Sequence, residues 1–256
     1  VAESLVGEVW PSAEPGEDPV LYGHAVLEPR DPVEVRRLQT FNLTYTVGRY
    51  GLDDTGAIRV VFRAMSDGQA LQVSDSSAPN YVTASASTGI PLGVEYRGRG
   101  AAARPRWKSL TVTVNGGYLS EGDVITIVFG DTTGGSPGMR VQTMADGGFE
   151  FKVLADVCAV GHFVPIPDTP TIAIVPGPPV VWKAILPTLR RPGESFRFGL
   201  KAEDKWGNPT DRAAGGFVFE TTLPVKGLPN TFDYPLGEKA IEFSGLSVSD
   251  SGVLRI

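Results

Sequence analysis

Two adjacent carboxylates, Asp53 and Asp54, stand in a turn between two apolar runs and are flanked by Gly51 and Gly56. Paired carboxylates in such a turn are candidate ligands for calcium, which takes about six to eight oxygen ligands in proteins. Aspartates in turns also accept hydrogen bonds from nearby backbone, and this turn lacks the alternating Asp/Asn ladder of an EF-hand loop. We therefore name Asp53 and Asp54 as the candidate metal ligands and leave the plain turn as the alternative.

Other side chains that usually carry catalysis are few. The chain has two histidines, His24 and His162, and one cysteine, Cys158. A zinc site usually draws on several His or Cys ligands, so only a mixed site that includes carboxylates could form here. Cys158 lies in an apolar run, which predicts a small buried residue rather than a nucleophile. Because no Gly-x-Ser-x-Gly motif is present, the sequence predicts no nucleophile elbow, no catalytic residue and no cofactor.

Aromatic side chains offer a second kind of chemistry, the stacking of sugar rings. Trp206, Trp107 and Tyr50 flank expected turns or strand ends, as do Trp10 and Tyr96. Large aromatic residues also fill cores and cap the ends of sandwiches. Trp206 is the best exposed candidate, because a Gly/Asn/Pro turn follows it. We name Trp206, Trp107 and Tyr50 as candidate ligand-binding residues, with carbohydrate as the possible ligand.

Composition excludes some classes of partner. The formal net charge is −6 and the sequence pI is about 5.0, which opposes binding to nucleic acid. A basic run from Arg97 to Lys108 is interrupted by glycine and alanine, and it is expected to be a solvated loop. No run of about 18 apolar residues exists, so we expect no membrane span and a soluble protein, cytoplasmic or periplasmic. The oligomeric state stays open.

The elements that position these residues are expected to be strands. Apolar residues alternate with polar ones in several runs, and successive side chains of a strand point to opposite faces. Asn-Gly and Asp-Gly clusters separate the runs, as tight hairpins require. No segment of ten or more residues has clean helical spacing. The alternating runs are residues 41–47, 58–64, 110–114 and 149–153. The sequence predicts an all-β fold.

A proline-rich stretch, residues 165–170, indicates a domain boundary, because closely spaced prolines make a stiff connector. We expect a larger β-sandwich domain over residues 1–165 and an immunoglobulin-like β-sandwich domain over residues 166–256. The second domain should hold six or seven short strands, among them residues 171–175, 180–186 and 253–256. Because residues 252–256 read as the middle of a strand, we expect this domain to be truncated at its C-terminal end.

Several segments resemble one family of uncharacterised bacterial proteins, the domain-of-unknown-function family 3604. The segments are residues 23–29 (GHAVLEP), 41–62, 128–131 with 134–138, 186–193 and 202–209. The resemblance implies that this region is the N-terminal part of a protein whose downstream domain is similar to metal-dependent hydrolases. The family's metal ligands have no counterparts here. The motif from Asp204 to Pro209 (DKWGNP) also resembles bacterial immunoglobulin-like repeats.

These observations favour a non-catalytic accessory or structural module that supports or docks a separate metal-dependent hydrolase domain. The expected partner is therefore a C-terminal domain of the same protein, absent from this chain. One alternative is a carbohydrate-binding module that uses the exposed aromatics. A second is that loops of this chain complete the hydrolase active site, and a third is a purely adhesive or structural module.

Overall fold

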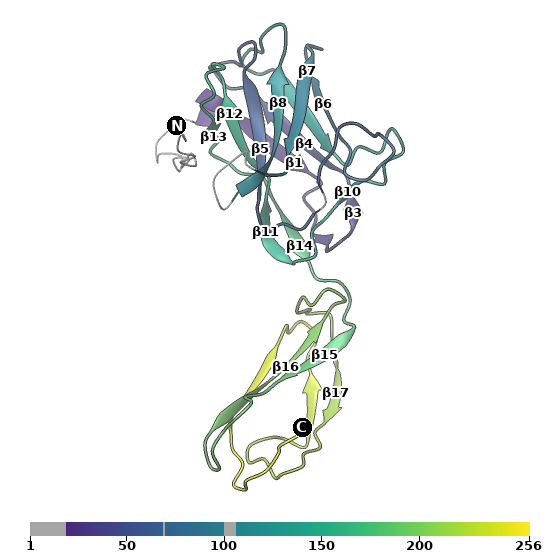
Figure 1. The fold of residues 1–256 in the computed structure, drawn as a ribbon, viewed down its shortest axis with the longest axis vertical. Helices are drawn as coiled ribbons and strands as arrows, with labels where there is room; N and C mark the ends of the chain where they lie inside the picture. The colour runs from purple at the N-terminus through teal and green to yellow at the C-terminus, as the bar shows by residue number, and fades with distance from the viewer. Residues whose placement is uncertain (1–18, 69, 100–105) are drawn as a thin grey trace, which may run out of the picture. The chain divides into compact units, whose positions relative to one another are not determined.

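The computed structural model describes residues 19–68, 70–99 and 106–256, and its regular secondary structure is almost wholly β-strand (Figure 1). The chain forms two compact units, unit 1 (Val1–Val175) and unit 2 (Pro176–Ile256). A single short helix, α1 (Pro19–Tyr22), occurs in the described residues. The all-β prediction is confirmed. Within the described part of the chain, no helix is long and apolar enough to cross a membrane.

Unit 1 holds strands β1 to β14. Their bounds are β1 (His24–Glu28), β2 (Val33–Glu34), β3 (Leu38–Gln39), β4 (Phe41–Thr46), β5 (Ala57–Arg63), β6 (Val82–Ala86), β7 (Leu92–Arg97), β8 (Arg106–Val114), β9 (Val124–Phe129), β10 (Met139–Arg140), β11 (Asp146–Glu150), β12 (Lys152–Asp156), β13 (Val164–Pro165) and β14 (Thr171–Val175). The two large sheets have the orders β1-β4-β9-β6 and β13-β12-β5-β8-β7, and the small ones are β11-β14-β2 and β10-β3.

The core of unit 1 lies between the two large sheets. Alternate residues of β4 and β5, such as Leu43, Tyr45, Ile58 and Val60, are fully buried, as the period-two pattern predicts. The buried Tyr45 hydroxyl donates a hydrogen bond to the backbone oxygen of Tyr22 at 2.5 Å. Burial raises the pKa of Tyr45 well above its ordinary value. Most buried apolar residues of unit 1 form one contiguous core.

Phe151 marks a point where the chain changes sheet. The sequence reads residues 149–153 as one strand, but β11 pairs with β14 whereas β12 pairs with β5. Phe151 falls between them and is fully buried. Its ring lies 5.3–5.5 Å from the rings of Phe41, Phe62, Phe129 and Phe149. The single-strand prediction is therefore wrong in topology, although every apolar residue it named is buried.

The boundary between the units lies ten residues beyond residue 165, at Val175 and Pro176. Strand β14, which we expected in the second domain, pairs antiparallel with β11 and parallel with β2. Ile172 and Ile174 are buried in the core of unit 1, so the prolines of residues 165–170 lie inside that unit. A second proline-rich stretch, residues 176–179, follows Val175, the last residue of unit 1.

Unit 2 is a small sandwich of two antiparallel sheets, the architecture of immunoglobulin-like domains. Its strands are β15 (Val181–Ile185), β16 (Phe196–Glu203), β17 (Gly215–Val218), β18 (Thr231–Tyr234) and β19 (Ile241–Leu246), in the orders β15-β16-β19 and β17-β18. Residues 253–256 form no strand, contrary to the sequence prediction. Leu254 and Ile256 instead pack against the aromatic core as part of an irregular segment.

Candidate docking surface

Strand β15 is exposed along its whole length. All five of its residues are exposed, and β15 pairs with β16 alone, at the edge of its sheet. Three of the five are large apolar side chains, Val181, Trp182 and Ile185. Edge strands usually carry charges that discourage pairing with other chains, whereas β15 has one charged residue, Lys183. Such a strand is suited to contact with another polypeptide.

Strand β17 lies on the same side of unit 2 as β15 (Figure 1). The ring of Trp182 stands edge-on to Phe217 of β17 at 4.7 Å and to Tyr234 of β18 at 4.8 Å. Burial, followed by the charge of Glu238, raises the pKa of Tyr234. On the other face of β17, Val218 is 74% exposed. We call β15, with its exposed residues Val181, Trp182 and Ile185, the open edge of unit 2.

The core behind the open edge is only partly covered. Side chains of both sheets meet there, because Phe219 lies 5.6 Å from both Phe198 and Phe243, and Phe232 lies 5.0 Å from Phe243. Five core residues are buried: Phe196, Phe198, Leu200, Tyr234 and Leu246. Eleven more are partly buried: Leu186, Phe217, Phe219, Val225, Leu228, Phe232, Ile241, Phe243, Val248, Leu254 and Ile256. Most apolar side chains of unit 2 therefore still touch solvent.

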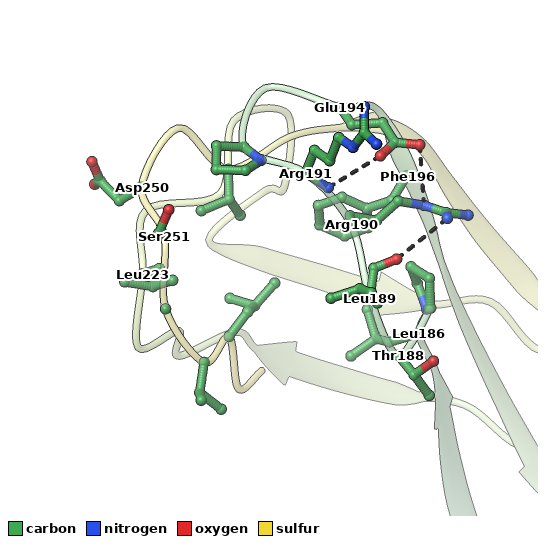
Figure 2. Close-up of a pocket in the computed structure, with 16 residues that line it drawn as sticks. Leu186, Thr188, Leu189, Arg190, Arg191, Glu194, Phe196, Leu223, Asp250 and Ser251 are labelled. Carbon is green, nitrogen blue, oxygen red and sulfur yellow. Dashed lines mark hydrogen bonds and ion pairs between the residues drawn. The ribbon is translucent and has the colours of Figure 1, made fainter.

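An open hollow of about 540 Å³ enters this core from one end of unit 2 (Figure 2). Residues 186–194 form one side and residues 248–254 the other, with Leu223 between them. The inner wall is apolar and includes Leu186, Phe196 and Leu254. Its volume lies within the range of about 300–1,000 Å³ common for binding sites. The hollow is suited to apolar side chains.

At the rim of the hollow, Glu194 contacts its two neighbouring arginines, one through its side chain and one through its backbone. Arg190 Nε lies 4.0 Å from Glu194 Oε1, and the backbone N–H of Arg191 donates to Glu194 Oε2 at 3.1 Å (Figure 2). Gly193 N donates to the Val248 carbonyl at 2.7 Å, which joins the two sides. These contacts hold the shape of the loops.

Asp204 organises the turn that carries Trp206. Its carboxylate accepts hydrogen bonds from the backbone N–H groups of Gly177, Trp206 and Asn208 at 2.8–2.9 Å, and from the Asn208 side-chain amide. Burial pushes the pKa of Asp204 upward, but these hydrogen bonds outweigh it and hold the pKa below the ordinary value. The DKWGNP motif therefore acts through one aspartate that fixes the start of unit 2.

Of the two candidate metal ligands, the carboxylate of Asp54 is engaged with backbone groups, and Asp53 is held through its backbone. Asp54 Oδ1 accepts hydrogen bonds from Gly116 N at 2.7 Å and Gly117 N at 3.4 Å, and Asp53 N donates to the Val157 carbonyl at 3.0 Å. No group of three His, Cys, Asp or Glu that could hold a metal ion occurs among the residues described. Calcium binding at Asp53 and Asp54 stays a prediction.

The candidate aromatic residues belong to different elements, two in unit 1 and one in unit 2. Tyr50 is 56% exposed in unit 1 and stands edge-on to Tyr22 at 5.5 Å. Trp107 is half-buried near the start of β8. Trp206 is 46% exposed in unit 2, with Lys205 Nζ 5.4 Å from its ring. Sugar binding by any of them stays a prediction.

Two smaller expectations have different outcomes. Trp10 lies outside the described residues. Cys158 is exposed, so the prediction of a buried cysteine is wrong. It follows the buried end of β12 and begins a turn that Asp156 holds by accepting hydrogen bonds from Val160 N and Gly161 N. An apolar run in the sequence therefore became a surface turn.

Sequence reasoning missed the open edge and the hollow. The apolar run at residues 180–186 is visible, but it reads as a strand with a buried face. The sequence does contain one signal of an unusual strand, because apolar residues occur at both odd and even positions of this run. They are Val180, Val181, Trp182, Ala184 and Ile185. A strand covered on only one face would alternate instead. The hollow has no comparable signal, since its walls come from segments far apart in the chain.

Comparisons with known proteins find only solved structures whose folds are distantly similar. No family model matches the chain, and no curated protein does. A cohesin module from a Clostridium perfringens family 33 glycoside hydrolase has a TM-score of 0.33 and 12% identity, covering 61% of this chain and 99% of that one. AvmM, which catalyses macrocyclization in alchivemycin A biosynthesis, has a TM-score of 0.34 and 14% identity, with 63% and 93% covered. FdeC, an Escherichia coli adhesin, has a TM-score of 0.19 and 10% identity, with 92% and 91% covered.

Proposed function

We propose that this chain is a non-catalytic accessory module of a larger bacterial protein, and that unit 2 docks a separate domain. The observation that carries the proposal is the partly covered core of unit 2, in which eleven apolar residues remain partly exposed beside an exposed edge strand. Apolar surface left open in this way is the usual mark of an interaction site. The docked domain supplies the missing cover.

The use of acidic side chains supports an accessory role. Aspartates in both units accept hydrogen bonds from backbone N–H groups and so hold turns in place. They are Asp54, Asp67, Asp75, Asp123, Asp131, Asp146, Asp156 and Asp204. A carboxylate that is committed to turn geometry is poorly placed to act as a general base. The same bonds make the loops rigid, which suits a scaffold.

The resemblance to family 3604 gives the class of partner. We take the docked domain to be that family's metal-dependent hydrolase domain, since the segments of resemblance run through both units. In this arrangement the hydrolase domain holds the metal and the substrate, and the present chain supports it.

A binding titration tests the docking. A hydrolase domain of family 3604, produced separately, is titrated into the 256-residue chain by calorimetry. Ile185→Glu places a charge on the open edge and should weaken binding at least ~10-fold, because a desolvated unpaired charge costs more than 1.4 kcal/mol. Val160→Glu is the control, since Val160 is an exposed apolar residue of unit 1, 72% exposed against 54% for Ile185. Equal binding by both variants would contradict the docking surface.

A second measurement tests the non-catalytic role. The chain alone is screened against phosphoesters and simple esters, and its bound metals are quantified by elemental analysis. We expect neither turnover nor stoichiometric metal. Either one in the isolated chain would overturn the proposal and return attention to Asp53, Asp54 and the two histidines.

A further inference from the structure

One asparagine of the chain is followed by glycine, at Asn115-Gly116, directly after β8. The other four precede a residue with a side chain, and they are Asn42, Asn80, Asn208 and Asn230. The backbone nitrogen of the next residue can attack an asparagine side chain, which closes a succinimide ring and releases ammonia. Asparagine is one of the thermolabile residues of proteins. Glycine leaves the attacking nitrogen accessible, because it has no Cβ.

The turn at Asn115 and Gly116 has room for this ring. Both residues are exposed. Gly116 has a φ of 74°, and a Cβ added to it would meet nothing within 4 Å. Water can therefore reach the ring, and ammonia can leave it.

Asp54 contacts the nitrogen that would attack. Its Oδ1 accepts a hydrogen bond from Gly116 N at 2.7 Å and a longer one from Gly117 N at 3.4 Å. A general base has to lie about 2.6–3.2 Å from the atom whose proton it takes. A carboxylate that is committed to a turn is poorly placed for the proton of an outside substrate, but it is in place for a proton of the turn itself. Asp54 meets this requirement for Gly116 N.

The side-chain carbonyl of Asn115 is polarised by a backbone donor. The orientation of the amide that satisfies both of its polar atoms places Oδ1 2.9 Å from Gly93 N and Nδ2 3.3 Å from the Val114 carbonyl oxygen. Gly93 belongs to β7, which pairs with β8. Negative charge develops on Oδ1 when the carbonyl carbon is attacked, and the Gly93 N–H stabilises it as an oxyanion-hole donor does. Nucleophile, base and oxyanion donor therefore meet at one turn.

We propose that Asn115 is a site of self-modification, at which Asp54 promotes deamidation. Asp54 takes the proton of Gly116 N as that nitrogen forms a bond to Asn115 Cγ. The bond between Cγ and Nδ2 then breaks, and the nitrogen leaves as ammonia with a proton that solvent relays from Asp54. Water opens the ring at either of its two carbonyl carbons, which gives aspartate or isoaspartate at position 115. The chain and water supply every atom, and no electrons are exchanged with another molecule.

The product differs from the parent in charge and in backbone. Position 115 gains a negative charge beside the Val114 carbonyl, to which Nδ2 donated. Isoaspartate also adds one carbon to the main chain at the end of β8. The reaction takes place in unit 1 and needs no partner, so it is independent of docking by unit 2.

Peptide mass spectrometry of the 256-residue chain follows the reaction. Digestion with trypsin gives a peptide of residues 109–140, in which Asn115 is the single asparagine. Replacement of NH2 by OH raises its mass, and chromatography separates the aspartate form from the isoaspartate form. We expect both forms, because the ring can open at either carbonyl carbon. Aspartate alone would mean that water attacks the side chain directly, and would overturn the proposal.

Asp54→Asn tests the base. The new side chain keeps an acceptor for Gly116 N, but it cannot take the proton. At pH ~6 the variant should modify Asn115 at least ~10-fold more slowly, since general-base catalysis typically contributes about 100-fold or more. The difference should shrink at pH ~8, where hydroxide ion serves as the base. A rate equal to the parent's or above it at pH ~6 would show that the hydrogen bond only shapes or protects the turn, and the proposal would be wrong.

Asp53→Asn is the matched control. It removes the same charge from the same turn and keeps the hydrogen bond from the residue 53 backbone N–H to the Val157 carbonyl. It should modify Asn115 at the parent's rate. The new asparagines at positions 53 and 54 lie in a separate tryptic peptide, residues 50–59. Circular dichroism confirms that both variants fold, and equal slowing by both would mean that the charge or shape of the turn sets the rate, which would overturn the proposal.

Discussion

Unit 1 and unit 2 use the same kind of alternating strand but cover their cores to different degrees. In the described residues, the core of unit 1 has 31 buried apolar residues and 7 that are partly buried, whereas unit 2 has 5 buried and 11 partly buried. Unit 1 closes its core between sheets of four and five strands, and unit 2 has sheets of three and two. The difference shows that alternation specifies an apolar face without specifying what covers it.

The largest expected effect is a contrast between two phenylalanines. Phe151→Ala should destabilise unit 1 by about 4 kcal/mol, because it leaves a cavity among four aromatic rings in a closed core. Phe219→Ala should cost unit 2 only about 1–2 kcal/mol, since that ring is partly exposed and its surroundings are already open. Urea unfolding followed by circular dichroism, with the transition of each unit fitted separately, measures both. Equal losses would mean that the core of unit 2 is closed in solution.

How far the sequence predicts this contrast depends on the segment. Residues 41–47 and 58–64 were placed correctly, because alternation and the turn between them are local properties. The crossing at Phe151 and the pairing of β14 with β2 were not, because they depend on partners that are 91–99 and 141 residues away in the sequence. The prolines of residues 165–170 look like a linker, yet the neighbouring Ile172 and Ile174 hold that segment in unit 1.

The candidate site was less predictable than the fold. Trp206 was recognised as exposed from its Gly/Asn/Pro turn, and it is. The open edge was not recognised, because residues 180–186 have the composition of a buried strand and only the absence of a covering neighbour exposes them. Asp53 and Asp54 looked like cation ligands, but the amides that Asp54 binds belong to a hairpin some sixty residues away.

The next effect in size concerns the hydrogen bonds that Asp204 accepts in unit 2, where the core is only partly covered. Asp204→Ala leaves the N–H groups of Gly177, Trp206 and Asn208 without their acceptor, which should cost about 2–3 kcal/mol. Asp250→Ala, an exposed residue of the same unit, is the control and should change stability by less than about 0.5 kcal/mol. Thermal unfolding of unit 2 measures both changes. A loss in unit 1 instead would contradict this assignment.

The same residue predicts the acid sensitivity of unit 2. Its folded pKa is lowered, so the stabilisation is present above the unfolded pKa of about 3.9 and is lost as pH falls through the lower folded value. The melting temperature of unit 2 should therefore fall below pH ~4, and the fall should be smaller in Asp204→Ala. An identical fall in parent and variant would show that other carboxylates dominate.

The smallest expected effect is a gain in stability rather than a loss. It tests most directly whether there is open space beside β17 in unit 2. At Gly215 of β17 an added Cβ would meet nothing within 4 Å, whereas at Gly130 of unit 1 it would overlap the backbone nitrogen of Met139. Gly215→Ala should therefore stabilise unit 2 by about 0.5 kcal/mol, because alanine lowers the entropy of the unfolded chain and brings no clash. Gly130→Ala is the contrasting variant and should destabilise unit 1. A destabilising Gly215→Ala would mean that the space beside β17 is already filled in solution, which would weaken the comparison between the two units at its central point.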